Sequence, residues 1–471
     1  MTIPPLGVGV VYVAGLEPLL EPGAAPLSVV EIEPQTRWIF DPAAAQPYRM
    51  APETLSQFAA LPQRKLVHGV GFPVGGTRQA DPAHLPLFRQ VIDALQAPWA
   101  SEHLGFNRTG DGLSTRLFLP QLQTPAGVAA AAATIRATQR ELSVPFAVET
   151  GVNYLRPRQG ELSDGAFLRA VVEAADCGIL LDLHNLYANQ RNGRQAVRDF
   201  LAEIPLERVW EIHLAGGMEL NGYWLDAHSG PAPAEVFDLA AELVPRLPNL
   251  GALIFEILPI YVQRAGLDAI RRQIDRMDEI WRCREQPRRR SETTPASEQK
   301  VIAMPLPGDP SPAQWEDTLG ALAVGQDTRG GIAEALKQDP GLAVIQKLVW
   351  NFRAGDVAAH LPLTTRALLQ RLGEGPTRAL LDSYFAAVPP KVFPTEEVLA
   401  FADYLAAQEL AVPYLAEVLA YDRAVVRARA FGERGIVEFP AEPEPFLSAL
   451  ADGHTPQLPP GGARYQVEIT P

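Results

Sequence analysis

The chain of 471 residues is predicted to fold as an α/β protein, a TIM-type (β/α)8 barrel followed by a smaller, mainly helical C-terminal domain. Three observations lead to this prediction. Eight short apolar runs alternate with helical patterns over the first 285 residues, which is typical of a parallel sheet covered by helices. Eight such units within this length favour a closed barrel. After residue 300 the patterns are almost all helical.

The eight apolar runs are expected to be the barrel strands, because each is short and rich in Val, Ile or Leu, as strands buried on both faces are. In order they are 7–15, 27–34, 65–72, 98–106, 145–153, 177–187, 208–216 and 251–259. The helical patterns between them include 84–97, 124–143, 164–177 and 233–247. A doubly wound open sheet is the rival arrangement, but no GxGxxG motif follows the first run.

The pattern breaks at residues 284–300, REQPRRRSETTPASEQK, which are charged and lack apolar periodicity. We therefore divide the chain into a metal-binding barrel (1–285), a linker (286–300) and a C-terminal domain (301–471). Helices of the C-terminal domain are predicted at 312–325, 331–338, 342–354, 364–373, 376–388, 395–408 and 413–430. The tail contains one expected short strand, ARYQVEIT.

Composition excludes several classes of protein. The formal net charge of -14 argues against a general nucleic-acid binder, which usually carries a basic face. The N-terminus lacks the features of a signal peptide, and no apolar run is long enough to span a bilayer, so we expect a cytoplasmic protein with no membrane partner. Cys177 and Cys283 are too few for a disulfide framework or a thiolate metal cluster.

Residues able to bind metal gather at the C-terminal ends of the predicted strands, where TIM-type barrels carry out their chemistry. Six strands and the loop after the seventh contribute them: His68, His103, Glu149, Asp182, His184, Asn185, His213, Glu256, and in the loop Asp226 and His228. Imidazole and carboxylate ligands together suit Fe, Mn or Zn. The set is too large for one metal ion, and a carboxylate such as Glu149 can bridge two. The sequence therefore predicts a site for two or three metal ions.

Each residue also has a structural interpretation. A single strand histidine is more often a hydrogen-bonded core residue, and Glu149 or Glu256 alone could be half of an ion pair. Asn185 could cap a loop, and His184 could be a ligand, a partner of a ligand or a proton shuttle. These interpretations would all have to hold at the same end of one barrel, where few basic partners are present. The metal site is therefore favoured.

Seven motifs follow one another along the barrel in a characteristic order. They are HGVGFPVGG (68–76), SEHLGF (101–106), VETGVNYL (148–155), LLDLHNLYAN (180–189), IHLAGG (212–217), WLDAHSGPAP (224–233) and LIFEI (253–257). With this set the chain resembles the multinuclear non-heme iron-dependent oxidative enzymes, which include the oxidase subunit of methanobactin biosynthesis. The resemblance covers about residues 5–285. The wider superfamily is similar to xylose isomerases and endonuclease IV.

The resemblance implies three metal positions, the first two of which share one bridging carboxylate. They are His68 with His103 and Glu149; Glu149 with Asp182, His213 and Glu256; and Asn185 with Asp226 and His228, a weaker position. The implied cofactors are two or three iron ions in a mixed-valent Fe(II)/Fe(III) state, with O2 as co-substrate. The family usually has Asn where this chain has His184, a departure that bears on the third position.

The activity that the resemblance implies is oxidative modification of a ribosomally synthesised peptide, at a cysteine or another specific residue. The candidate catalytic residues are His184, Tyr187 and Asn153, and Ser101 is a further candidate for contact with the substrate or a ligand. A zinc or manganese hydrolase or isomerase on the same barrel is the first alternative. The second is a non-catalytic, peptide-binding scaffold, against which the nearly complete ligand set argues.

Two segments of the C-terminal domain resemble the helical partner protein that recognises the leader peptide in this family. They are SYFAAVPPKVFPTEEVLAFADYL (383–405) and VPYLAEVLAYDRAV (412–425). We therefore expect a fusion in which the C-terminal domain recruits the precursor peptide in place of a separate partner. A lid or a dimerisation domain is the alternative interpretation.

Overall fold

The computed structural model describes residues 3–41, 44–285, 303–305, 308–457 and 464–471. Eight parallel strands form the closed barrel that the sequence predicts. They are β1 (Gly7–Val11), β2 (Val29–Ile32), β5 (Arg64–Gly69), β6 (Ala100–His103), β9 (Phe146–Glu149), β10 (Gly178–Asp182), β11 (Val209–Ala215) and β14 (Ala252–Glu256). Strand β1 pairs in parallel with both β2 and β14, which closes the ring.

The sixth predicted strand run was too long. Helix α6 (Leu183–Arg191) begins directly after β10, so His184 and Asn185 lie on the first turn of a helix and not on the strand. The physical reason is an N-cap: the Asp182 carboxylate accepts a hydrogen bond from the backbone N–H of Asn185 at 2.8 Å. The apolar run continues across this boundary, so periodicity alone does not mark it.

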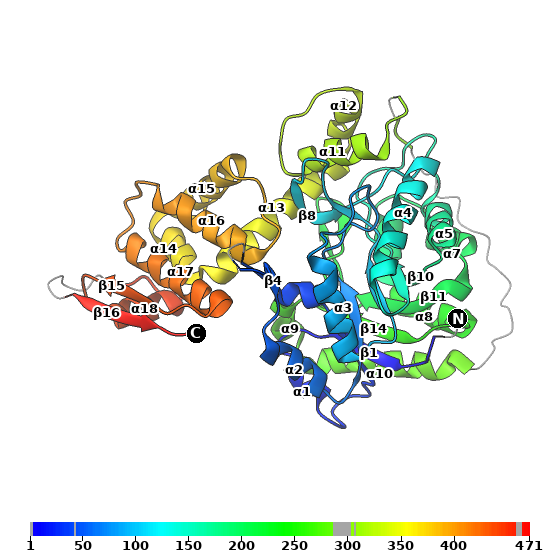
Figure 1. Ribbon diagram of the computed structural model, residues 1–471, viewed down its shortest axis with the longest axis horizontal. Helices are drawn as coiled ribbons and strands as arrows, with labels where there is room; N and C mark the ends of the chain where they lie inside the picture. Colours follow the sequence, from blue (N-terminus) through cyan, green and yellow to red (C-terminus); the bar gives the residue numbers. More distant parts are fainter. Residues whose placement is uncertain (1–2, 42–43, 286–302, 306–307, 458–463) are drawn as a thin grey trace.

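Helices surround the barrel (Figure 1). The principal ones are α3 (His84–Leu95), α4 (Pro125–Glu141), α5 (Asp164–Ala175), α8 (Ala234–Leu243) and α10 (Leu267–Arg282). Helix α10 buries Ile270, Ile274 and Met277, whose spacing places them on one face of a helix. Their burial, with that of matching residues on the other helices, joins strands and helices in one hydrophobic core.

Three hairpins, which the sequence did not predict, extend the C-terminal face of the barrel. They are β3 (Ile39–Phe40) with β4 (Tyr48–Arg49), β7 (Phe106–Arg108) with β8 (Ser114–Leu119), and β12 (Met218–Leu220) with β13 (Tyr223–Leu225). The last hairpin turns at Asn221 and Gly222, both with positive φ. An Asn-Gly pair is a strong hairpin signal, so this hairpin could have been predicted.

The C-terminal region is helical, as predicted. Its elements are α11 (Pro312–Ala323), α12 (Gly331–Lys337), α13 (Pro340–His360), α14 (Pro362–Leu372), α15 (Glu374–Ala387), α16 (Pro394–Ala406), α17 (Leu415–Phe431), β15 (Gly435–Phe439), α18 (Pro443–Ala451) and β16 (Tyr465–Ile469). The expected tail strand is β16, which pairs antiparallel with β15. The predicted linker, residues 286–300, lies outside the described residues.

This region packs into two separate hydrophobic cores. Helices α11 and α12 and the first half of α13, as far as Val349, share a core with loops of the barrel; we call them the cap. The rest of α13, from Val357, and helices α14 to α18 form a core of their own; we call them the outer lobe. Figure 1 shows the outer lobe beside the barrel, with α13 running between the two. Helix α13 therefore belongs to both cores.

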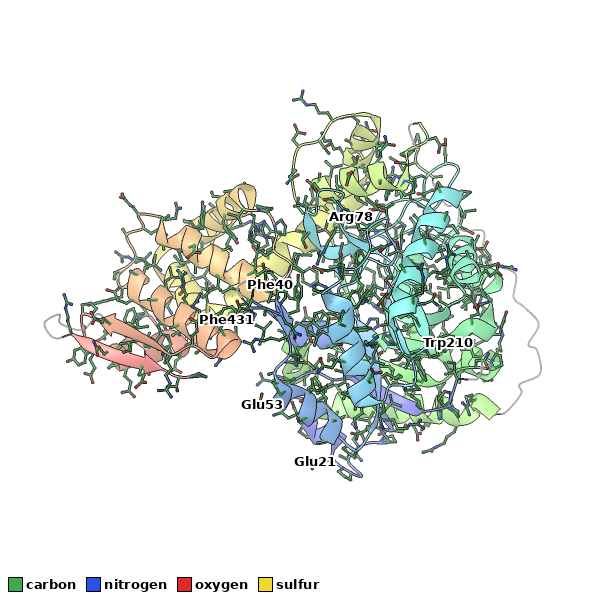
Figure 2. The ribbon with its side chains drawn as sticks, in the orientation of Figure 1. Glu21, Phe40, Glu53, Arg78, Trp210 and Phe431 are labelled. Atoms are coloured by element: carbon green, nitrogen blue, oxygen red, sulfur yellow. The ribbon has the colours of Figure 1, made fainter. Side chains whose placement is uncertain are left out.

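The outer lobe contacts the barrel through an aromatic cluster. Phe393 is buried, and its ring stacks on Phe40 with centroids 6.0 Å apart. The rings of Tyr48 and His84 lie 5.5 Å and 5.8 Å from it. Figure 2 shows Phe40 where the outer lobe meets the barrel. Burial of Phe393 by barrel residues indicates that this contact stabilises the position of the lobe.

The stability of this junction is expected to depend on pH through His84. Burial, with the nearby Arg108, lowers the pKa of His84 to about 4, from 6.5. Below 6.5 the unfolded chain binds a proton that the folded chain excludes, so stability is lost as the pH falls from 6.5 towards about 4. By about pH 5 the loss of stability is on the order of 2 kcal/mol. Urea unfolding at about pH 7.5 and about pH 5 should show a smaller loss in His84→Phe than in the original chain. An identical loss in both would contradict the assignment.

Candidate metal centre

The predicted strand-end ligands lie together at one end of the barrel. His103, Glu149, Asp182 and Glu256 are the last residues of their strands, and His68 is the last but one of its own. The parallel register places His103 beside Glu149 and Asp182 beside His213. Two groups of ligand atoms could each hold a metal ion: His68–His103–Glu149 and Glu149–Asp182–His213–Glu256.

Glu149 links the two groups. Its Oε2 atom lies 3.1 Å from His68 Nε2 and 3.2 Å from His103 Nε2. Its Oε1 atom lies 3.9 Å from His213 Nδ1, which is also 3.1 Å from Glu256 Oε1. One carboxylate thus directs an oxygen atom into each group, which is the arrangement of a bridging ligand.

A third set of ligand atoms lies next to the second group. His228 Nε2 is 2.8 Å from Asp226 Oδ1 and 3.4 Å from Glu256 Oε2. The backbone N–H of Asp226 donates to the Tyr154 hydroxyl at 3.2 Å. Asn185 donates its side-chain N–H to the carbonyl of Thr150 at 3.1 Å, which leaves its buried Oδ1 without a hydrogen bond.

Buried ligand atoms without hydrogen bonds are concentrated in these groups. They are His68 Nε2, Glu149 Oε2, Asp182 Oδ2, Asn185 Oδ1, His213 Nδ1, Asp226 Oδ1, His228 Nε2 and Glu256 Oε2. Buried polar atoms nearly always have hydrogen-bond partners, so such a concentration requires an explanation. All of these atoms offer lone pairs, and this nitrogen and oxygen set suits Fe, Mn or Zn. The residues therefore fit bound metal ions.

Two hydrogen bonds and one ion-pair contact lie at the outer nitrogens of three histidines. His68 Nδ1 lies 2.8 Å from Ser101 Oγ, and His103 Nδ1 lies 3.2 Å from the carbonyl of Gly69. His213 Nε2 lies 2.9 Å from Glu31 Oε2. A metal-binding histidine usually donates its other N–H to such an acceptor, which fixes the ring and leaves the inner nitrogen unprotonated. Ser101, a predicted contact residue, lies against a ligand-type histidine.

Three buried glutamates behind these ligands were missed. Glu31 and Glu211 are fully buried next to His213, and the three form another close group of ligand atoms. Burial and the neighbouring Glu211 raise the pKa of Glu31 to about 8. Glu102 accepts hydrogen bonds from the backbone N–H groups of Phe72 and His103. A single acid inside an apolar strand run is the signal that could have identified all three.

Carboxylates and imidazoles alter each other's protonation in this cluster. Burial alone would raise the pKa of Glu256, but His213 and His228 lower it to about 2. Burial would lower the pKa of His103, but Glu149 and Glu102 raise it to about 10. Protonated imidazoles therefore balance the carboxylates in the metal-free protein, and a bound cation would replace those protons.

A cavity of ≈ 370 Å³ connects the ligands with the C-terminal region. At the metal centre it is lined by His103, Asp226, His228 and Glu256, together with Glu33, another acid that the sequence analysis did not single out. Phe118 stacks on His103 with centroids 4.8 Å apart, and Leu258, Leu348 and Phe352 also line the cavity. Leu348 and Phe352 come from α13, so the C-terminal region forms part of the wall.

The three candidate catalytic residues lie in different surroundings. Asn153 lines the cavity, but its side-chain oxygen accepts from the backbone N–H of Leu155 at 3.0 Å. Tyr187 is not among the described residues that line the cavity; its hydroxyl accepts from Arg191 at 3.1 Å. His184 is fully buried, with Nε2 2.9 Å from the indole nitrogen of Trp224.

Sequence comparison matches residues 38–281 to one family model, described as RiPP precursor modification enzyme MbnB/TglH/ChrH. A UPF0276 protein of Streptomyces avermitilis is 31% identical over 209 residues, 43% of this chain and 43% of that protein. One of Anaeromyxobacter sp. is 32% identical over 189 residues, 40% of this chain and 66% of that protein. The match thus spans less than two thirds of either relative.

Among solved structures, a xylose isomerase domain protein from Planctomyces limnophilus has 16% sequence identity and a TM-score of 0.38. The match covers 60% of this chain and all of that one (100%). Mannonate dehydratase from Streptococcus suis has 12% identity and a TM-score of 0.40, with 60% of this chain and 95% of that one covered. Within the described part of the chain, no helix is long and apolar enough to cross a membrane.

Proposed function

Because the chain belongs to the MbnB/TglH/ChrH family of RiPP precursor modification enzymes, we propose that it is an iron- and O2-dependent oxidase of a ribosomally synthesised peptide. The modified position would be a cysteine or another specific residue. The observation that carries this proposal is the position of Glu149, which directs one oxygen atom into each of two ligand groups. A bridged pair of metal ions at this position would lie at the end of the cavity.

The proposed metal positions are those of the three ligand sets. They are His68, His103 and Glu149; Glu149, Asp182, His213 and Glu256; and Asn185, Asp226 and His228. Iron, when bound, supplies the O2 and one-electron chemistry that protein side chains lack. The chain holds the ligands in place through Ser101, Gly69 and Glu31, which face the outer nitrogens of the first three histidines.

The cavity is proposed to bind the reacting residue of the peptide. Its volume of ≈ 370 Å³ is near the lower end for small-ligand sites, so it accepts one or two residues rather than a folded peptide. Phe118, Leu258 and Phe352 make its walls largely apolar and limit access of water to the reacting atoms. The remainder of the peptide would lie outside the mouth of the cavity.

We propose that the C-terminal region recruits and positions the precursor peptide in place of a separate partner protein. Support comes from α13, which forms part of the cavity wall through Leu348 and Phe352 and also belongs to the core of the outer lobe. A peptide held by the outer lobe would therefore be held by an element that reaches the metal centre. A lid role for the cap is compatible with this arrangement.

The proposal is tested on the full chain, produced with iron and purified without oxygen. We expect two or three irons per chain and a mixed-valent Mössbauer signal. Incubation with O2 and precursor peptides encoded beside the gene should then change the mass of one peptide. Stoichiometric zinc or manganese that iron does not displace would overturn the proposal and indicate a hydrolase or isomerase, for which the same ligand types are suitable.

Replacing Phe352 by aspartate tests the cavity. Phe352 is 46% exposed and lines the cavity wall, so a charge there should weaken entry of an apolar peptide segment without affecting the metal ligands. We expect KM for the peptide to rise about 10-fold, equivalent to about 1.4 kcal/mol, with iron content unchanged. Ile260→Asp is the matched control, because Ile260 is 75% exposed on the barrel helix α9 (Pro259–Ala265) and does not line this cavity. Equal effects of both variants would contradict the assignment.

A further inference from the structure

The outer nitrogen of His184 faces a hydrogen-bond donor, whereas those of the other oriented histidines face acceptors. The outer nitrogens of His68, His103 and His213 face a hydroxyl, a carbonyl and a carboxylate. The outer nitrogen of His184, Nε2, instead accepts from the indole N–H of Trp224 at 2.9 Å. An indole nitrogen only donates, so Nε2 carries no proton and the neutral ring carries its proton on Nδ1.

The proton on Nδ1 points at a proposed metal ligand. His184 Nδ1 lies 3.3 Å from Asp226 Oδ1, within ion-pair distance, and neither atom has a hydrogen-bond partner among the described residues. Nε2 therefore accepts from the indole, and the Nδ1 proton faces a carboxylate oxygen that has no other partner among the described residues. We infer that His184 is a positioning residue, which holds Asp226 through Nδ1–H, and is not itself a metal ligand. This inference rests on the proposed third metal position.

The indole that determines this arrangement is firmly held. The Asn192 side chain bonds both to the backbone N–H of Trp224 at 2.8 Å and to its carbonyl at 3.0 Å. The Arg191 guanidinium lies 4.4 Å from the centre of the indole, and Tyr187 packs edge-on at 5.9 Å. Tyr187, a candidate catalytic residue, therefore supports Trp224.

Gly217 makes the contact between Trp224 and His184 sterically feasible. A Cβ atom at this position would lie 2.3 Å from Trp224 Nε1 and 2.5 Å from His184 Nε2, closer than real Cβ contacts. Any side chain here would push the two rings apart. The close approach of the hairpin to α6 thus requires glycine at this position.

The first experiment separates the two polar contacts of His184, one to Trp224 and one to Asp226. In His184→Asn the amide nitrogen lies near the position of Nδ1, so the donor to Asp226 is kept. In His184→Gln the amide lies near Nε2, so a partner for Trp224 is kept but the donor to Asp226 is lost.

Anaerobic iron titration of the full chain should show normal binding in the Asn variant. The Gln variant should lose 10–100-fold in affinity at one iron only, the effect typical of losing a partner behind a ligand. Equal loss in both variants would overturn the inference.

The second experiment does not depend on metal binding. NMR of metal-free protein with ¹⁵N-labelled histidine should show His184 protonated at Nδ1, with its signals assigned by their loss in the Asn variant. Trp224→Phe keeps an aromatic ring and removes the donor, so it should allow the Nε2–H form to appear. Protonation at Nε2 in the unaltered protein would overturn the inference. If the protein binds no iron, the proposed function fails, and the NMR result still decides the role of His184.

Discussion

Replacing Glu149 by glutamine is expected to remove iron from two positions at once. Glu149 Oε2 lies 3.1 Å and 3.2 Å from the Nε2 atoms of His68 and His103, and Oε1 faces His213. Glutamine offers one neutral oxygen atom in place of two charged ones. It can therefore bind a metal ion weakly in one group and cannot provide an oxygen ligand to the other. Affinity at both positions should fall by more than the 10–100-fold typical of losing a partner behind a ligand.

The measurement is the iron content of the anaerobically purified variant, together with peptide modification under O2. We expect at most one iron per chain and no detectable product. Glu242→Gln is the matched control, because Glu242 is an exposed partner of Arg198 on the outside of the barrel. Unchanged iron content in the Glu149 variant would refute the ligand assignment, while equal loss in the control would indicate a general effect on folding.

Replacing Trp315 by alanine is expected to cause the largest loss of stability. Trp315 is 2% exposed in the core shared by the cap and the barrel, and its indole N–H donates to the carbonyl of Pro120 at 2.9 Å. Truncation of a buried tryptophan leaves a cavity and typically costs about 3–5 kcal/mol. The carbonyl of Pro120 also loses its partner, which adds to the cost.

Denaturant unfolding monitored by circular dichroism measures this effect. Trp350→Ala is the control. Trp350 is half-buried on α13, so its replacement should lower the free energy of unfolding by less. If cap and barrel unfold as one unit, Trp315→Ala shifts the midpoint of the barrel transition. A barrel transition that does not move would show that the cap is an independent unit, in conflict with the shared core.

The barrel and the grouping of its proposed ligands were predictable because both follow from local patterns. Each barrel strand lies inside an apolar run, except that β5 begins one residue earlier, and parallel strands of a closed barrel end on one face. Residues as distant in sequence as His68 and Glu256 therefore come together once the fold class is known. The helix start at Asp182 could have been predicted, because Asp is a common N-cap residue. The apolar run that continues across it favoured a longer strand instead.

What could not be predicted depends on contacts between distant segments. The role of His184 is set by Trp224, which lies 40 residues later on an unpredicted hairpin. The cap looks like any other helical segment in the sequence, since the apolar face of α11 does not reveal that it packs on barrel loops. Glu31 lies beside His213 although β1 and β14 separate their strands in the barrel, a proximity that no local pattern shows.

The pairing of β1 with β14 constrains the order of events during protein synthesis. The ring cannot close until the ribosome has made Glu256, which ends the last strand and is also a proposed ligand. The cap, Pro312 to Val349, is made afterwards. Domains generally fold in order as they are synthesised. The nascent chain thus holds all the proposed ligands before it has a cap, and in this interval a metal ion would have the most open route to the proposed site.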